Sequence, residues 1–222
     1  MTIRTVLFPL DLDRPQLAAL FRVLDDAEKL RSAEYRFDRD RNRFIARRGQ
    51  LRCFLAELTG YKPEDLPIRQ MVCGKPYLAD IALNFSIAHS HDLCLCAVSD
   101  RAAIGCDLER CNPALASPDV SAAFFAQAEN SALTQLDGRA RVDGFFRLWT
   151  CKEAFVKGTG RGLSVPLDSF SVSLEVGTHV QRIDTAPDWT LYSFQPLPGY
   201  WAAIASNDSA PEWNADDLCH IG

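Results

Sequence analysis

The chain has 222 residues, of which 47% are hydrophobic and 24% are charged, a composition typical of globular domains. Its 24 lysine and arginine residues are outnumbered by 29 aspartate and glutamate residues, which gives a formal net charge of −5. These values exclude a wholly disordered or low-complexity chain and a general binder of polyanions. No apolar run reaches the roughly 20 residues of a membrane-spanning helix, so we expect a cytoplasmic protein that binds neither membranes nor nucleic acid.

The first half of the chain predicts a strand, helices and then three more strands. Residues 3–10 predict the opening strand, and apolar residues at helical spacing predict a helix over 17–29. An arginine-rich helix with an apolar stripe follows and ends at Gly60, because glycine commonly terminates helices. The three later strands are predicted at residues 84–87, 93–99 and 104–108.

The second half predicts helices followed by strands. A proline-containing loop at 111–119 is the best candidate boundary, and it divides the chain into domains at 1–110 and 111–222. The elements predicted after this loop are helices at 120–136 and 145–157 and strands at 170–176, 189–194 and 200–205.

Arginines are concentrated in the predicted helix of the first half. This stretch contains Arg31, Arg36, Arg39, Arg41, Arg43, Arg47, Arg48 and Arg52. Such a run is often only a solvated helix face, but arginine side chains also match the geometry of phosphate oxygens. Arg43 and Arg48 are five residues apart and should point about 140° away from each other on a helix, so we predict that they do not bind one phosphate.

Two carboxylates alternate along the predicted strand that ends the first half. Asp107 and Glu109 should face the same way, with Leu108 turned into the core. Adjacent carboxylates repel each other unless a cation or hydrogen-bond donors neutralise them. The pair is therefore a candidate Mg²⁺ site, and a solvated strand end is the alternative.

A second cluster lies on the helix predicted at 145–157. Trp149, Glu153 and Lys157 are spaced four apart and should share one face, where a glutamate–lysine pair can also be simple helix support. Three glycines follow at alternate positions and predict a flexible end without the signature of a P-loop. They are Gly158, Gly160 and Gly162.

Two other kinds of site are disfavoured. His89, Ser90 and Asp92 lie in one predicted turn, where groups so close in sequence seldom reach catalytic-triad geometry, and no nucleophile elbow is present. The eight cysteines contain no CxxC pair, so buried reduced thiols are favoured over a zinc site at Cys94 and Cys96.

Five motifs in order carry a family resemblance. They are Gly74-Lys75-Pro76, NFSIAHS at 84–90, IGCDLE at 104–109, FRLWTCKEAFVK at 146–157 and GLSVPL at 162–167. Over residues 28 to 206 this succession resembles the 4′-phosphopantetheinyl transferases of the large, pseudo-dimeric, surfactin-synthetase-activating type. The resemblance implies an α+β fold of two similar halves related by a pseudo-twofold, with the active site between them. The similarity of residues 93–100 to 200–207 agrees with such a duplication.

The resemblance also implies a reaction and a set of residues. The enzyme would transfer the phosphopantetheine arm of coenzyme A to a serine of an apo acyl or peptidyl carrier protein, leaving adenosine 3′,5′-bisphosphate. Mg²⁺, or Mn²⁺ as a substitute, would be held by Asp107, Glu109 and Glu153. The implied catalytic residues are Glu153 as base, Lys157 at the leaving phosphate and His89. The implied coenzyme A-binding residues are Arg31, Arg43, Arg48, Gly74, Lys75, Pro76, His89, Ser90, Asp107 and Lys157.

Two positions depart from the family pattern, and two other functions stay open. Ala88 stands where many relatives have serine, so we expect one hydroxyl contact to phosphate to be missing. His91 stands where glycine is frequent, so we expect a different turn after His89. A metal-dependent phosphohydrolase acting on a nucleotide pyrophosphate could use the same carboxylates. A non-catalytic nucleotide-binding module would need only the basic helix. We expect a monomer, and the motifs leave the choice of carrier protein open.

Overall fold

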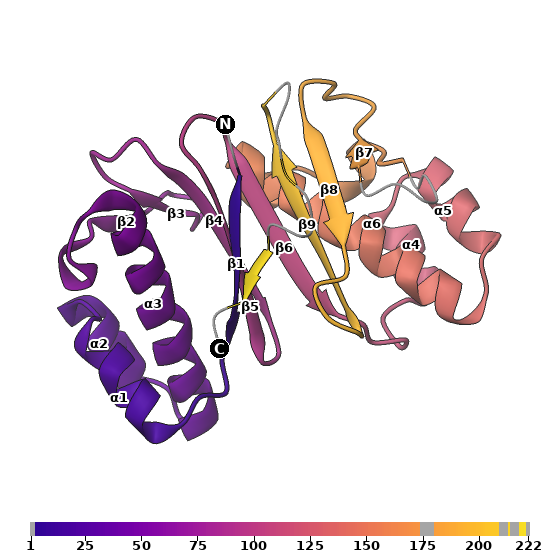
Figure 1. Ribbon diagram of the computed structural model, residues 1–222. Coiled ribbons are helices and arrows are strands. Elements are labelled where there is room, and N and C mark those ends of the chain that lie inside the picture. The colour runs from indigo at the N-terminus through magenta and orange to yellow at the C-terminus, as the bar shows by residue number, and fades with distance from the viewer. Residues whose placement is uncertain (1–2, 174–179, 209–212, 214–217, 221–222) are drawn as a thin grey trace.

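The protein has two sheets that face each other, and helices cover the outer face of each (Figure 1). This computed structural model describes residues 3–173, 180–208, 213 and 218–220. Helices and antiparallel sheets are combined throughout, which confirms the α+β class. Within the described residues, no helix is both long and apolar enough to cross a membrane.

The first sheet has the strand order β10-β1-β5-β4. Its strands are β1 (Arg4–Pro9), β4 (Asn84–Ser90), β5 (Leu93–Ser99) and β10 (Leu218–His220). Neighbouring strands are antiparallel except β10, which pairs in parallel with β1. The helices on this sheet are α1 (Arg14–Arg22), α2 (Asp26–Ala33) and α3 (Asp38–Thr59). A short 3-10 turn and a hairpin follow them, η1 (Pro63–Asp65), β2 (Ile68–Gln70) and β3 (Pro76–Leu78).

The second sheet has the strand order β6-β9-β8-β7 and is antiparallel. Its strands are β6 (Ile104–Arg110), β7 (Val180–Arg182), β8 (Thr190–Phe194) and β9 (Tyr200–Ser206). Its helices are α4 (Pro118–Phe124), α5 (Gln127–Thr134) and α6 (Gly138–Thr159), followed by η2 (Gly162–Ser164) and η3 (Leu167–Ser169). The repeated arrangement of helices and sheet agrees with two similar halves.

The core has three layers because strand side chains alternate between two buried faces. On β1, Val6 and Phe8 pack toward α3, whereas Leu7 packs toward the second sheet. A middle layer joins the two sheets, in which Leu95 of β5 and Ile204 of β9 are fully buried. Both sheets therefore bury both faces, which explains why β5 is apolar at almost every position.

Capping divides two segments that the periodicity predicts as single helices. The predicted helix at 17–29 is two helices, because Asp25 accepts a hydrogen bond from the Glu28 backbone and starts α2. The predicted helix at 120–136 is also divided, because Phe125 is extended and Glu129 accepts from the Ala126 backbone at the start of α5. Apolar spacing continues across both breaks and so conceals them.

The strands also differ from prediction at their ends. The strand predicted at 84–87 continues to Ser90, so His89 lies in β4 rather than in the turn. In the predicted strand at 170–176, Val172 forms only an isolated bridge with Ile183, and residues 174–176 lie outside the described part. The short strands β2, β3, β7 and β10 have no counterpart in the prediction.

The two sheets meet along β4 and β6. The Ser86 hydroxyl accepts a hydrogen bond from the Cys106 backbone at 3.0 Å, and the Ser90 hydroxyl accepts one from the Arg110 backbone at 3.1 Å. At this seam between β4 and β6, serine hydroxyl oxygens thus accept the backbone hydrogen bonds that main-chain carbonyl oxygens accept within a sheet. Because β6 belongs to the second sheet, the link between the sheets falls at residues 100–103, before the boundary expected after residue 110.

Candidate active site

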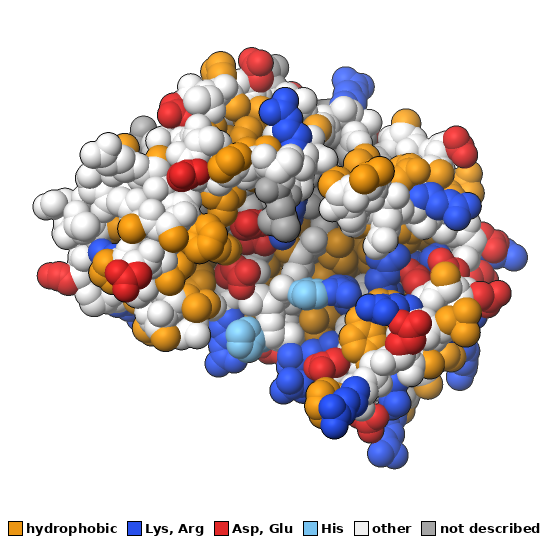
Figure 2. All heavy atoms as spheres, turned by 180° about the vertical axis from the view of Figure 1, so that it is seen from behind, with side chains coloured by type: hydrophobic (Ala, Val, Ile, Leu, Met, Phe, Trp, Pro, Cys, Tyr) orange, Lys and Arg blue, Asp and Glu red, His pale blue; other side chains and the backbone are white. Residues whose placement is uncertain are grey.

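A cavity of about 340 Å³ lies beside the seam between the sheets. Its ionisable lining comes from α3, β4, β6 and α6, namely Arg47, Arg48, His89, Asp107, Glu109 and Lys157. Gly74 and Pro76, at the end of the β2–β3 hairpin, form another wall. Figure 2 shows the same hollow from behind, with acidic, histidine and basic side chains gathered between the two lobes.

Gly105 allows β6 to approach α6 closely enough to build this cavity. A Cβ atom at Gly105 would lie 2.0 Å from the carbonyl oxygen of Ala154 and 2.3 Å from the backbone nitrogen of Gly158. Gly158 lies inside α6 and packs against Trp189, so the prediction of a flexible glycine end is wrong at this residue. The two glycines bring the strand and helix backbones together, and the acidic motif of β6 therefore faces α6.

Asp107 is the most deeply buried acidic group of the cavity, with 3% of its surface exposed. Its Oδ1 atom accepts a hydrogen bond from the Lys157 ammonium at 2.6 Å. Its Oδ2 atom is buried and has no hydrogen-bond partner. A buried carboxylate oxygen without a hydrogen-bond donor lowers the stability of the folded protein, and its lone pairs remain available to coordinate a cation.

Glu109 and Glu153 bring two more carboxyl groups toward Asp107. Burial raises the pKa of both glutamates, and the negative charge of Asp107 raises each pKa further. The Ser90 hydroxyl donates to Glu109 at 2.9 Å. Within the described residues, no three such side chains already surround one point as a metal cluster would. The unpartnered oxygen and the three carboxylates nevertheless fit a hard divalent cation in donor chemistry.

Lys157 is the cation that the cavity itself supplies. Burial lowers the pKa of Lys157, but the Asp107 carboxylate offsets this effect and the net pKa is above its ordinary value. The side chain is therefore an ammonium ion at neutral pH. From α6 it faces both the carboxylates and the open part of the cavity.

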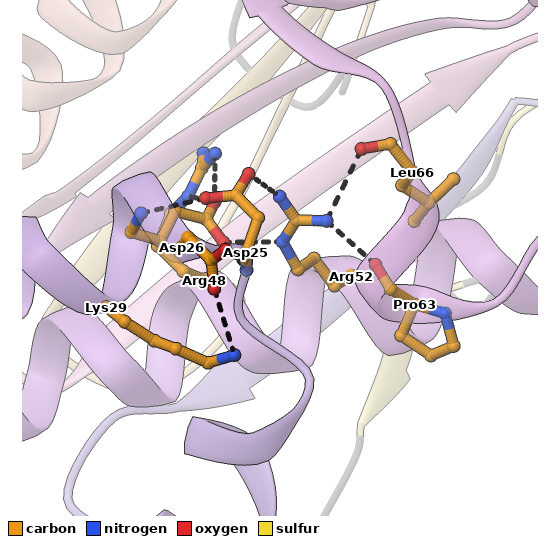
Figure 3. Close-up of polar contacts among 8 residues, drawn as sticks. Asp25, Asp26, Lys29, Arg48, Arg52, Pro63 and Leu66 are labelled. Atoms are coloured by element: carbon orange, nitrogen blue, oxygen red, sulfur yellow. Dashed lines mark hydrogen bonds and ion pairs between the residues drawn. The ribbon is translucent and has the colours of Figure 1, made fainter.

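The arginines of α3 differ in whether an acid already neutralises them. Arg43 donates two hydrogen bonds to Asp11, both at 2.7 Å, and Arg48 forms an ion pair with Glu28 at 2.5 Å. Arg48 lies beside Arg52 over the acidic start of α2 (Figure 3). Arg43 lines a different cavity from Arg48, and that they do not bind one phosphate stays a prediction.

Arg47 is the cavity residue that sequence reasoning missed. It is half-buried, and no salt bridge to it is found within the described part of the chain. Burial lowers the pKa of Arg47, and no carboxylate compensates for the buried charge. Arg47 is four residues after Arg43, so the two share one helix face, and this spacing could have indicated that Arg47 belongs to the same site.

Like Arg43 and Arg48, three further residues expected to bind coenzyme A have partners within the protein. Arg31 pairs with Glu34 on the surface and does not line the cavity. The Lys75 ammonium donates to the carbonyl oxygens of Ile104 at 2.9 Å and Gly158 at 3.3 Å. The Ser90 hydroxyl is occupied at the seam and at Glu109, as described above. Their roles in coenzyme A binding remain predictions.

Two sequence profiles match the chain in succession. The profile of the 4′-phosphopantetheinyl transferase superfamily matches residues 103–205. The profile of the 4′-phosphopantetheinyl transferase N-terminal region matches residues 13–101. The interval between the two profiles coincides with the link between the two sheets.

Curated relatives carry the same function in their names. The 4′-phosphopantetheinyl transferase HetI of Nostoc sp. strain PCC 7120 is 35% identical over 89% of this chain and 84% of its own length. A putative 4′-phosphopantetheinyl transferase of Synechocystis sp. strain PCC 6803, slr0495, is 33% identical over 87% of this chain and 83% of its own. The 4′-phosphopantetheinyl transferase Sfp of Bacillus subtilis strain 168 is 36% identical over 63% of this chain and 62% of its own.

Proposed function

The chain belongs to the 4′-phosphopantetheinyl transferase superfamily, and from this premise we propose that it transfers the phosphopantetheine arm of coenzyme A to a serine of an apo carrier protein. In this reaction the serine oxygen forms a bond to the β-phosphorus of coenzyme A. The bond between that phosphorus and the bridging oxygen breaks, and adenosine 3′,5′-bisphosphate leaves. The serine loses its proton to a base on the enzyme.

The observation that carries the proposal is the charge arrangement of the cavity beside the seam between the two sheets. Acidic groups centred on Asp107 lie beside Lys157, and basic groups of α3 line the same space. A pyrophosphate needs positive charge around its oxygens, whereas a serine nucleophile needs a nearby base. Arg47, Arg48 and Lys157 supply positive charge to this cavity, and Asp107 and Glu109 supply carboxylates. Glu153, which we propose as the base, interacts electrostatically with Asp107 and Lys157 but is not among the residues that line the cavity.

We assign the site residues as follows. Asp107, Glu109 and Glu153 would hold Mg²⁺, which would neutralise pyrophosphate charge when bound. Glu153 accepts the serine proton, directly or through a water molecule. Lys157 stabilises the leaving phosphate as a cation, and His89 contacts phosphate oxygens from β4. Gly74 and Pro76 shape the wall against which the donor lies.

Intact-protein mass spectrometry tests this proposal. The enzyme is incubated with coenzyme A, Mg²⁺ and a panel of apo carrier proteins of the acyl and peptidyl types. We expect at least one carrier to gain the mass of one phosphopantetheine group, and the same carrier with its acceptor serine changed to alanine to gain none. Release of free phosphopantetheine without modification of any carrier would instead indicate a phosphohydrolase. Size-exclusion chromatography tests the further expectation of a monomer.

A further inference from the structure

Ser90, the last residue of β4, makes two hydrogen bonds to β6 and has 8% of its surface exposed. Its hydroxyl oxygen accepts a hydrogen bond from the Arg110 backbone at 3.1 Å. The same hydroxyl donates its proton to Oε2 of Glu109 at 2.9 Å. One side chain therefore contacts both the backbone of β6 and a carboxylate that lines the cavity beside the seam.

A serine hydroxyl can donate only one hydrogen bond, and Glu109 receives the one that Ser90 has. The Arg110 amide is itself a donor, so it occupies a lone pair of the hydroxyl oxygen and leaves the proton free for Glu109. The Nδ1 atom of His91 is a competing acceptor, but it lies 3.4 Å away, beyond the usual range for such a bond. In this arrangement the hydroxyl has no second proton for a phosphate oxygen.

Ser86 makes the same kind of contact with the backbone of β6 but none with a carboxylate. It lies four residues before Ser90 on β4, so the two side chains project from the same face of the strand. Its hydroxyl accepts from the Cys106 backbone at 3.0 Å, and among the residues that the structure describes no acidic side chain is hydrogen-bonded to it. Joining the strands thus requires only the hydroxyl oxygen, and donation to Glu109 is a separate contribution of Ser90.

Glu109 has a flexible side chain and lies near a second acid of the same strand. Fixing a glutamate costs rotamer freedom, and the negative charge of Asp107 acts against its carboxylate. A hydrogen bond to one carboxylate oxygen holds the group in place and leaves the other oxygen for a cation, as outer partners do for metal ligands. We propose that Ser90 is a positioning residue, which holds Glu109 ready to bind the divalent cation and does not itself bind coenzyme A. This inference rests on the proposed function.

Titration of the metal-free protein with Mn²⁺, without coenzyme A or carrier protein, tests the inference. Electron paramagnetic resonance measures the free ion and so gives the dissociation constant. We expect S90A to weaken Mn²⁺ binding about 10-fold, as for loss of an outer partner of a metal ligand, and the matched control S86A to weaken it less than about twofold. S90T keeps the hydroxyl and should bind Mn²⁺ within about threefold of the wild type. Thermal unfolding shows whether each variant is folded, and S90C, with a weak donor of similar size, replaces S90A if the alanine variant does not fold.

Transfer kinetics separate positioning from substrate binding. For S90A we expect the half-saturating Mg²⁺ concentration to rise about 10-fold, whereas the KM for coenzyme A at saturating Mg²⁺ should change less than about twofold. A raised KM for coenzyme A with normal Mn²⁺ binding would make Ser90 a substrate ligand and overturn the inference. Equal weakening of Mn²⁺ binding by S86A and S90A would reduce the role of Ser90 to joining the strands and overturn it as well.

The E109Q variant shows whether Ser90 acts through Glu109. In the E109Q background, S90A should weaken Mn²⁺ binding by less than about a further twofold, because the two residues act through one contact. A further loss of about 10-fold would mean that Ser90 acts through another group and would contradict the inference. A wild-type enzyme that shows Ser90-dependent Mn²⁺ binding but modifies no carrier would refute the proposed function and leave the inference standing.

Discussion

Arg52 and Lys152 occupy equivalent positions in the two halves. Each is the fifteenth residue of a 22-residue helix, α3 or α6, and each side chain is fully buried. Arg52 pairs with Glu28, and Lys152 pairs with Glu129, and both glutamates cap the start of the short helix that precedes the long one.

The second contact of each cation is also repeated. Arg52 donates to the carbonyl oxygen of Pro63, after α3, and Lys152 donates to that of Leu167, after α6 (Figure 3 shows the Arg52 set). A buried cation thus fixes a short helix and a following loop to the long helix in both halves. The lysine of the WTCKEA motif is therefore a structural residue of the second half, whereas the adjacent Glu153 interacts electrostatically with Asp107 and Lys157.

Lys152→Met should destabilise the protein by about 3–5 kcal/mol, because Glu129 would remain buried without its cation. Burial already raises the pKa of Glu129. With a folded pKa above the unfolded value, the variant is most stable below the unfolded pKa and loses stability as pH rises through the folded pKa. Urea unfolding should therefore show a smaller loss at pH 5 than at pH 8. The double variant with Glu129→Gln should recover part of the loss, and an equal loss at both pH values would contradict this account.

Gly105→Ala should separate β6 from α6 and abolish transfer. The new Cβ would meet backbone atoms of Ala154 and Gly158, which cannot rotate away as a side chain can. We expect loss of the cooperative thermal transition or a cost of more than about 3 kcal/mol. Gly144→Ala is the matched control on α6, because its Cβ would meet only the ends of Leu136 and Leu133 at 3.0 and 3.1 Å. A Gly105→Ala enzyme with normal activity would show that this close approach is not needed.

The sequence predicted the ends of secondary-structure elements well where the hydrophobic periodicity stops at a glycine. The ends of α3 and α6 follow this rule, since Gly60 and Gly160 both adopt the left-handed conformation at their C-caps. Helix division at Asp25 and Phe125 was not predicted, because one capping side chain changes the backbone without changing the apolar period.

The site was predicted best where its residues lie on regular elements. Alternation along β6 predicted that Asp107 and Glu109 face the same way, and both line the cavity together with Lys157. The spacing of α6 was less informative, because Trp149 packs in the core of the second half and Glu153 is not among the residues that line the cavity. Spacing does not show which charges are already neutralised, so Arg47 could not be distinguished from its paired neighbours Arg43 and Arg48. The ammonium of Lys75, which contacts carbonyls of the second half, depends on tertiary packing that no local pattern records.

Asp107→Asn should lower kcat/KM by about 100-fold or more while keeping the fold, because asparagine fills the same space without the charge. Removing that charge should also lower the pKa of Glu109 and Glu153, since Asp107 raises both after burial. Carbon-detected NMR of the metal-free protein measures the pKa values, and the transfer assay measures the rate. Unchanged glutamate titrations would indicate that the three carboxylates do not share one site.

Added Mg²⁺ should stabilise the protein more at pH 8 than at pH 5. The raised folded pKa values of Glu109 and Glu153 mean that the metal-free protein loses stability as pH rises through them. A cation binds the ionised carboxylates and reverses this loss by mass action. Saturating Mg²⁺ should raise the melting temperature by about 3 °C at pH 8 and by less at pH 5. Glu153→Gln is the control, and an equal shift in that variant would place the cation elsewhere.

Lys157→Arg should retain much more transfer activity than Lys157→Ala. The Asp107 carboxylate, 2.6 Å away, keeps Lys157 charged, and the net pKa above the ordinary lysine value makes it a poor proton donor. Its role is then to stabilise the leaving phosphate as a cation, and arginine preserves that charge although its shape differs. We expect kcat to fall about 10-fold in the arginine variant and about 100-fold or more in the alanine variant. Equal loss in both would favour proton donation by the ammonium. Full activity of Lys157→Ala would remove Lys157 from the mechanism, and the melting temperature of each variant shows whether the loss of its pair with Asp107 alters the fold.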